Sequence, residues 1–566
     1  MGLVRTFMIC GISTAVSLTA AEAKDFYLKP TQSGQVAGTP LAAISLQANN
    51  NSGTTRTRSY YRNRWLARQR ARNGGGEEGT TSSGQTTSPT PSSTPAQSTE
   101  QLKGSTDSGT SGGAKFVSAP KTGGDGGTTT TPTTTPSPTP TPTPAPAPMP
   151  SPTPTPTPTP APAPGQSTNP PAAGQTFANF NALAQSGQLS GGDRVFLLDG
   201  YHGPLSVTDL KVSSPITIAT MPGETAHVDS ITVRNSSNFV FKDLKVWATS
   251  PNAGTGALVR SYATSSNLAF IDLDVRSVAN AGNYAQWTGT DWKNNQRIGF
   301  QVEGNANTVA RNRVTGLFHG ILALGANALV EENIVDGFGG DGMRALGDNS
   351  VVRRNKVQNC FQWNSNHADA FQSFSRGANG KTGTGVVKNL TIEGNKFFEW
   401  TLASTNPLRC KLQGIGMFDG MFDGITIRNN VISSRAYHGI TIAGALNTKV
   451  VNNTVVNSGG TAPGYPWIRI AAHKNGTTSQ NTTVANNMAS GIKVNPDTTR
   501  KIVETNNFVV KNAAAEFVSP GQHNFALQSS SKGVDAGAPG LAPTVDIAGA
   551  KRPKGKAPDA GAYESF

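Results

Sequence analysis

The chain repeats one short pattern about every 22 residues between residues 215 and 510. Each copy is a brief alternation of apolar and polar residues around an asparagine, as in VARNRV, VEENIV and VRRNKV. The clean gaps between these asparagines are 21, 22 and 23 residues, and the longer gaps contain an insertion. Seven asparagines share this register: Asn312, Asn333, Asn355, Asn395, Asn430, Asn453 and Asn487.

A repeat of this length, with short strands and no helical periodicity, predicts an all-β fold of the solenoid type, a parallel β-helix. Strands so short bury no core alone, but coils stacked about 4.8 Å apart pair each backbone group with a neighbouring coil. The recurring asparagine fits an internal amide ladder between coils. The alternative is a surface turn residue that tolerates left-handed backbone.

The first 23 residues are typical of a secretory signal peptide. Arg5 supplies a positive start, an apolar stretch follows, and residues 21–23 form a small-x-small cleavage site. No other apolar run is long enough to span a bilayer. We therefore expect a protein that is secreted to the periplasm or outside the cell, without a transmembrane segment.

The mature chain divides into three parts by composition. Residues 24–50 begin with a strand-like KDFYLKP, and residues 173–566 contain the solenoid, with a short helix expected at 177–187. Residues 51–172 are rich in arginine, then in Gly, Ser and Thr, and finally in Pro and Thr. We expect that segment to be disordered because proline lacks a donor N–H and few apolar residues are present.

The net charge of +14 is unevenly placed, because seven arginines lie between Arg56 and Arg72 without an acid among them. Such a tract attracts polyanions, and for a secreted protein we expect an anionic surface or acidic glycan, not nucleic acid. The alternative is a solvated arm. Once the signal is removed only Cys360 and Cys410 remain. They either pair or stay as buried thiols.

Several stretches resemble one group of proteins. The HGI…ALVEENIV pattern resembles the right-handed parallel β-helix repeat of the pectate-lyase-like superfamily. SGQLSGGDRVFLLDGYHGPL resembles the first coil of bacterial polysaccharide lyases of the alginate-lyase and chondroitinase B type, and KDFYLKP resembles the strand before that coil. The ending DIAGAKRPKGKAPDAGAYES resembles their tail. The resemblance implies a right-handed coil, a long insertion at 51–172 within the N-terminal cap, and a polysaccharide as partner.

Strand alternation predicts which side chains point out of the solenoid. One outward file consists of Gln301, Leu322, Arg344, Gln372, Gly416, Thr441 and Arg469. A second file beside it, at the corner before each strand, consists of His319, Asp341, Asp369, Gln413 and His438. An Asp or His before Gly is also a common turn residue, which is the alternative for the second file.

The densest polar stretch holds Asp341, Arg344, His367, Asp369 and Gln372, which should fall on two adjacent coils. In β-elimination of a uronate glycan, His367 or His319 would be the base, and Arg344 would neutralise the carboxylate or act as the acid. In glycoside hydrolysis, Asp341 and Asp369 would be the carboxylate pair. A protein that only binds polysaccharide is the third alternative. We expect a lyase for an acidic polysaccharide.

Further residues would bind the substrate. Gln301, Gln372, Gln413, His438 and Arg469 are suited to hold hydroxyl and carboxylate groups, and Trp363 and Trp467 would stack on sugar rings. The tryptophans lie in insertions that would form groove walls, or they pack onto the solenoid. No acidic cluster matches a calcium-loop spacing, so we expect no cofactor; Ca²⁺ is the alternative, because some lyases that the chain resembles depend on it.

Overall fold

The computed structural model describes residues 23–31, 175–249, 255–459 and 465–565. All but Ala23 of the predicted signal peptide lies outside these residues, as do the predicted disordered segment 51–172 and its arginine tract. In the described part of the chain, no helix is long and apolar enough to cross a membrane.

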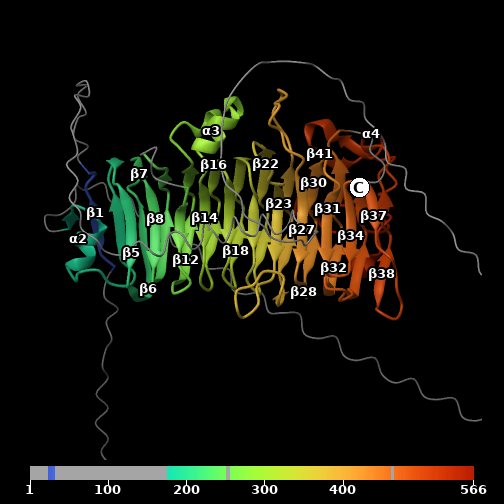
Figure 1. The fold of residues 1–566 in the computed structure, drawn as a ribbon, viewed down its shortest axis with the longest axis horizontal. Coiled ribbons are helices and arrows are strands. Elements are labelled where there is room, and N and C mark those ends of the chain that lie inside the picture. The colour runs from blue at the N-terminus through green and yellow to red at the C-terminus, as the bar shows by residue number, and fades with distance from the viewer. Residues whose placement is uncertain (1–22, 32–174, 250–254, 460–464, 566) are drawn as a thin grey trace, which may run out of the picture. The chain divides into compact units, whose positions relative to one another are not determined.

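The described chain winds through three parallel sheets, here called sheets A, B and C, in repeated coils (Figure 1). Successive coils follow one another in chain order along the stack, from cyan to red in Figure 1. This arrangement confirms the predicted parallel β-helix. Sheet C, which carries both predicted files, contains β5 (Pro204–Thr208), β8 (Ser230–Arg234), β11 (Ala257–Ser261), β14 (Ile298–Val302), β17 (His319–Ala323), β20 (Met343–Ala345), β23 (Asp369–Phe374), β27 (Gln413–Asp419), β31 (His438–Ala443), β34 (Trp467–Ala471) and β37 (Gly491–Lys493).

The other two sheets complete each coil. Sheet A contains β1 (Asp25–Leu28), β2 (Thr176–Phe177), β3 (Arg194–Leu197), β6 (Lys211–Thr220), β9 (Ser237–Lys242), β12 (Ser266–Ile271), β15 (Thr308–Ala310), β18 (Leu329–Glu331), β21 (Val351–Arg353), β24 (Val386–Lys388), β25 (Thr391–Glu393), β28 (Met421–Asp423), β29 (Thr426–Arg428), β32 (Ala445–Val451), β35 (Gln480–Ala485) and β38 (Ile502–Thr505). Sheet B contains β4 (Gly200–Tyr201), β7 (Ala226–Val228), β10 (Lys245–Val246), β13 (Asp274–Arg276), β16 (Arg313–Leu317), β19 (Ile334–Phe338), β22 (Lys356–Cys360), β26 (Lys396–Phe398), β30 (Val431–Ser434), β33 (Thr454–Asn457), β36 (Met488–Ala489) and β39 (Phe508–Val509).

The recurring asparagines form the predicted internal ladder at the turn between sheets A and B. The Asn333 side chain donates from Nδ2 to Asn355 Oδ1 at 2.9 Å, and the same oxygen accepts the Asn333 backbone N–H. The residue before each ladder asparagine has a positive φ, for example Glu332 at 58°. The ladder also includes Asn507, which accepts from Asn487 at 2.8 Å and which the repeat alignment missed.

The N-terminal end of the solenoid matches the predicted first coil. β1 pairs with β3 in parallel, although β3 lies far along the chain, and β2 pairs on the other side of β1. A helix, α2 (Phe180–Gln185), begins after Asn179, whose side chain accepts the Ala182 N–H and caps it. Its buried Phe180 and Leu183 join the solenoid core, so this amphipathic helix covers the first coil.

The longest described insertion on the sheet B side folds against the coils. It contains η1 (Ala281–Gln286) and α3 (Gly289–Asn294), and Thr288 and Asp291 form a capping box at the start of α3. A disulfide between Cys360 and Cys410 joins β22 to a second inserted loop, with 5.4 Å between the Cα atoms. Trp292 of the first insertion and Trp400 of the second are buried in the same cluster, so the two insertions form one packed layer on the solenoid.

The C-terminal residues lie on the outer face of sheet B. They contain α4 (Ala513–Glu516), the two-stranded sheet of β40 (Phe517–Ser519) and β41 (Asn524–Leu527), η2 (Pro520–Gln522) and η3 (Pro539–Leu541). Phe517 and Phe525 pack with sheet B residues such as Met488. The side chains of Arg552 and Glu564 are buried, and Arg552 donates to Glu564 at 2.8 Å, so the predicted tail is held as a structural cap.

Candidate functional site

The outward file on sheet C has the predicted register. Arg344 pairs with Gln372, Gln372 with Gly416, and Gly416 with Thr441. Thr441 pairs with Arg469, which pairs in turn with Lys493 on the last coil. The residues beside them that point inward, such as Ile321 and Ile440, are fully buried. Lys493 was not among the predicted residues, although Ser490, Gly491 and Ile492 before it repeat the pattern that precedes Arg344 and Thr441.

The corner file is also continuous, and each coil hydrogen-bonds to the next. The Asp341 backbone N–H donates to His319 Nδ1 at 2.8 Å, and the Asp369 N–H donates to Asp341 Oδ1 at 3.1 Å. Asp369 pairs in register with Gln413 on the following coil. The file continues through His438 to Trp467.

We call His319, Asp341, Arg344, Asp369 and Gln372 the closed network, because they are bonded to one another. Arg344 Nε donates to Asp341 Oδ2 at 2.5 Å, and Gln372 Nε2 donates to Asp369 Oδ2 at 3.0 Å. Both pairs join a corner residue to the outward residue three positions later. Asp341 is 2% exposed and Asp369 is 0% exposed. The two carboxyl groups therefore face protein rather than solvent.

Burial determines the protonation of the closed network. It raises the pKa of Asp369 well above the ordinary 3.8, and the negative charge of Asp341 raises it further. Burial also lowers the pKa of His319 to about 4, so this imidazole is neutral at neutral pH. Its Nδ1 already accepts the Asp341 N–H. His319 therefore lacks the free Nδ1 lone pair that a base at this atom would use.

A glycine makes room for the Asp369 carboxyl group. A Cβ atom on Gly416 would lie 2.5 Å from Asp369 Oδ1 and 2.6 Å from a ring carbon of Phe418. The carboxyl group thus lies over the bare backbone of β27, next to the Phe418 ring. Within the described chain Asp369 Oδ1 has no hydrogen-bond partner. Glycoside hydrolysis would require both carboxyl groups to reach the substrate. In this structure Asp341 and Asp369 are buried and do not reach the surface.

A second group of residues lies farther along sheet C. We call Phe418, Tyr437, His438, Trp467, Arg469 and Lys493 the open cluster. Three rings surround His438, with centroid distances of 4.2 Å to Tyr437, 4.8 Å to Phe418 and 5.5 Å to Trp467. Tyr437 is 49% exposed, and Arg469 and Lys493 are also exposed. This part of the face is accessible to a polymer.

His438 is held as a neutral imidazole. Burial, together with the positive charges of Arg469, His367 and Lys493, lowers its pKa to about 4. His438 Nδ1 is 2.7 Å from Thr441 Oγ1. When Nδ1 carries the hydrogen and donates to this hydroxyl, Nε2 keeps a lone pair that can accept a proton.

The cations of the open cluster have no acidic partners. Across the described residues, neither Arg469 nor Lys493 forms an ion pair, whereas Arg344 is paired with Asp341. The Lys493 ammonium lies 3.7 Å from the centroid of the Trp467 ring. An exposed ammonium above an aromatic ring, with a second exposed cation on the neighbouring strand, is suited to bind a carboxylate-bearing sugar.

The remaining predicted residues occupy different surroundings. His367 is exposed in the loop before β23, close enough to the open cluster for its charge to act on His438. Gln301 donates to Glu303 at 2.8 Å on β14, at a distance of several coils from the open cluster, and Gln413 is 8% exposed. Trp363 stacks on Trp292 with 5.1 Å between centroids. Trp467 alone of the two predicted tryptophans lies in the open cluster.

Four insertion aromatics do not form groove walls. Tyr284, Trp287, Trp292 and Trp400 are buried together in one cluster with Phe361. The Tyr284 hydroxyl donates to Asp336 at 2.5 Å, and glycines such as Gly337 allow the rings to approach the coils. They pack the insertions onto the solenoid, and Trp363 packs against them, which is the stated alternative to a groove wall for that tryptophan. No group of three or more His, Cys, Asp or Glu side chains in the described ranges could hold a metal ion.

The chain is similar to several known proteins. A family model described as "Right handed beta helix region" matches residues 217–460 and 378–531, which together exceed half of the chain. Pectate lyase Pel9A is 14% identical, with a TM-score of 0.36 over 69% of this chain and 93% of its own. A mannuronic acid specific family 6 lyase from human gut microbiota is 16% identical, with a TM-score of 0.33 over 57% of this chain and 83% of its own. No curated protein matches the sequence significantly.

Proposed function

Because this chain belongs to the right-handed β-helix family, we propose that it is a secreted lyase whose sheet C face binds and cleaves an acidic polysaccharide. The observation that supports this function most is a neutral histidine, His438, beside two exposed cations without acidic partners, Arg469 and Lys493. β-Elimination needs a base for the proton next to the sugar carboxylate and a positive charge to neutralise that carboxylate.

In this proposal His438 Nε2 takes the proton from the carbon beside the uronate carboxylate. The electron pair of that C–H bond forms the new carbon–carbon double bond, and the bond to the glycosidic oxygen breaks. The proton on His438 then returns to the departing oxygen, so the enzyme is regenerated. Arg469 and Lys493 stabilise the negative charge that builds up on the carboxylate in the transition state.

In this proposal, binding of the substrate makes His438 a stronger base. The positive charges of Arg469 and Lys493 disfavour protonation of His438 in the free protein. A bound carboxylate cancels part of this field, so the pKa of His438 rises toward the value that suits a base at neutral pH. Tyr437 offers an exposed ring beside His438 on which a sugar can stack.

The test is a screen of uronate polymers, such as polygalacturonate, alginate and a glycosaminoglycan, with the wild-type protein and His438→Ala. The ultraviolet absorbance of the unsaturated product reports elimination, and a reducing-end assay reports any cleavage. We expect absorbance with at least one polymer and none with the variant. Reducing ends without absorbance would indicate a hydrolase, and retention of polymer without cleavage would indicate a binding protein.

A further inference from the structure

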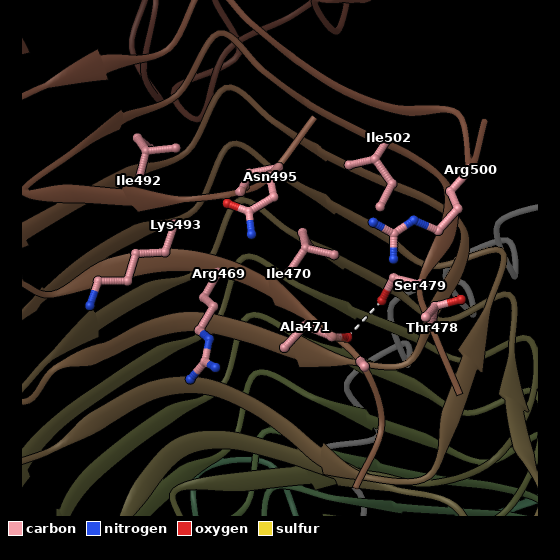
Figure 2. A pocket seen from close by; sticks show the side chains of 12 residues that line it. Arg469, Ile470, Ala471, Thr478, Ser479, Ile492, Lys493, Asn495, Arg500 and Ile502 are labelled. Atoms are coloured by element: carbon pink, nitrogen blue, oxygen red, sulfur yellow. Dashed lines mark hydrogen bonds between the residues drawn. The ribbon is translucent and has the colours of Figure 1, made fainter. Parts of the chain in front are cut away.

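A cavity of about 680 Å³ lies at the end of sheet C, between β34, β37 and β38 (Figure 2). This volume is within the range of about 300–1,000 Å³ that is usual for small-molecule sites. Ile470, Ile492 and Ile502 line its floor, and the side chains of Arg469, Lys493 and Asn495 also border it. We call it the terminal cavity.

The terminal cavity exists because the coils end there. The inward positions before it, Ile440 and Ile442, are fully buried under the next coil, whereas Ile470 and Ile492 are only half-buried. β37 is the last strand of sheet C in the described chain. The C-terminal cap packs on the outer face of sheet B, through residues such as Phe517, and leaves this end of sheet C uncovered.

The lining of the cavity is positively charged. It includes Arg469, Lys493 and Arg500, and none of the described residues that line it is acidic. Arg469 and Lys493 project from the same side of the isoleucine floor, and Arg500 lies on the opposite side (Figure 2). Asp497 balances the charge of Arg500, with 2.7 Å between Nη2 and Oδ2, so among the described residues the unpaired positive charges at the rim are those of Arg469 and Lys493.

We propose that the terminal cavity binds the end sugar of an acidic polysaccharide, so that cleavage at His438 releases short products from one end of the chain. This inference rests on the proposed function. An apolar floor beneath a rim of cations complements a uronate, whose C–H face is apolar and whose carboxylate accepts from a guanidinium. Arg469 both lines the cavity and lowers the pKa of His438, so the two sites adjoin.

The geometry of the coils gives the direction of the polymer. His438, Arg469 and Lys493 lie on three consecutive strands of sheet C, which span roughly 10 Å at about 4.8 Å per strand. A polymer that follows the outward file from Arg344 toward Lys493 therefore reaches the terminal cavity where the sheet ends. Its last sugar enters the cavity, and the bond near His438 lies within a few sugars of that end.

The experiment measures binding separately from turnover. Calorimetry with cleavage-deficient His438→Ala compares a uronate trisaccharide, a sulfated trisaccharide and a neutral glucose trisaccharide. Asn495→Trp is then added to fill the mouth of the cavity. Asn495 is exposed and its side chain makes no hydrogen bond within the described residues, so the change breaks no contact. Asn294→Trp on α3, also exposed, is the matched control.

We expect the uronate trisaccharide to bind, the neutral one to bind at least tenfold more weakly, and Asn495→Trp to weaken uronate binding about tenfold. In the otherwise wild-type protein, Asn495→Trp should lengthen the products while Asn294→Trp does not. Equal binding of the neutral sugar, tighter binding of the sulfated one, or unchanged binding and product length in Asn495→Trp would overturn the inference. If binding behaves as expected but no polymer is cleaved, the cavity assignment stands and the lyase proposal fails.

Discussion

The two halves of the outer face of sheet C use the same positions in opposite ways. In the closed network, Arg344 follows Asp341 by three residues and bonds to it; Gln372 bonds to Asp369 in the same manner. In the open cluster, the residue three positions before Arg469 is Pro466, which has no polar side chain. The register also shifts there, so that His438 pairs with Trp467. Whether an arginine in this file forms an ion pair therefore depends on the residue three positions before it.

The largest difference between the halves should be in stability. Arg344→Ala leaves the Asp341 carboxylate buried without its ion pair, which should cost about 3–5 kcal/mol of unfolding free energy. Arg469→Ala removes an exposed, unpaired cation and should cost less than about 0.5 kcal/mol. Urea unfolding of both variants measures this contrast. The double variant Asp341→Asn, Arg344→Ala should recover part of the lost stability. Equal stability of the two single variants would contradict the contrast between the closed network and the open cluster.

Activity should depend on the open cluster instead. His438→Ala removes the proposed base and should lower kcat by about 100-fold or more with the best uronate polymer. His202→Gln on the sheet B side is the control and should leave kcat unchanged. Initial rates of absorbance increase measure both. A His438→Ala protein with wild-type kcat would exclude this residue as the base.

The pH dependence of kcat/KM should show whether the positive charge of Arg469 lowers the pKa of His438. Since its pKa is about 4 in the free protein, the neutral base is lost, and kcat/KM falls, as the pH is lowered through about 4. Arg469→Ala removes a positive charge, so the pKa of His438 rises and the fall begins at a higher pH. The substrate ionises identically in both assays, so the shift belongs to the protein. An unchanged profile in Arg469→Ala would show that the two residues are not coupled.

The smallest effect should come from Asp369→Asn. The folded protein binds the Asp369 proton more tightly than the unfolded chain, so stability falls as the pH rises from the ordinary pKa of 3.8 through the raised folded value. Asparagine removes this dependence. We expect a small rise of Tm at neutral pH, little change near pH 3.8, and retained activity. Loss of activity would instead support a carboxylate pair as the catalytic groups.

Local patterns predicted much of the fold. The 22-residue repeat, the amide ladder and the two files on sheet C follow from strand alternation and turn geometry, which each coil satisfies by itself. The helix α2 lies within the predicted range 177–187. The place of KDFYLKP beside the first coil came from the resemblance and not from a local pattern, and in the structure β1 pairs with β3. Asn507 and Lys493 were not predicted, although VETNNFV and SGIK repeat the pattern, because the repeat was followed only as far as Asn487 in the ladder and Arg469 in the outward file.

The sequence by itself determined which side chains point out of the solenoid and in what order, because successive side chains of a strand point to opposite faces. Only the tertiary structure decided which of them meet solvent. Asp341 and Asp369 are covered because Arg344, Gln372 and the bare backbone at Gly416 close around them. The insertion aromatics are buried because two distant loops meet, and the terminal cavity is open because the cap lies on sheet B. Such contacts join residues far apart in the chain, which a periodic pattern does not record.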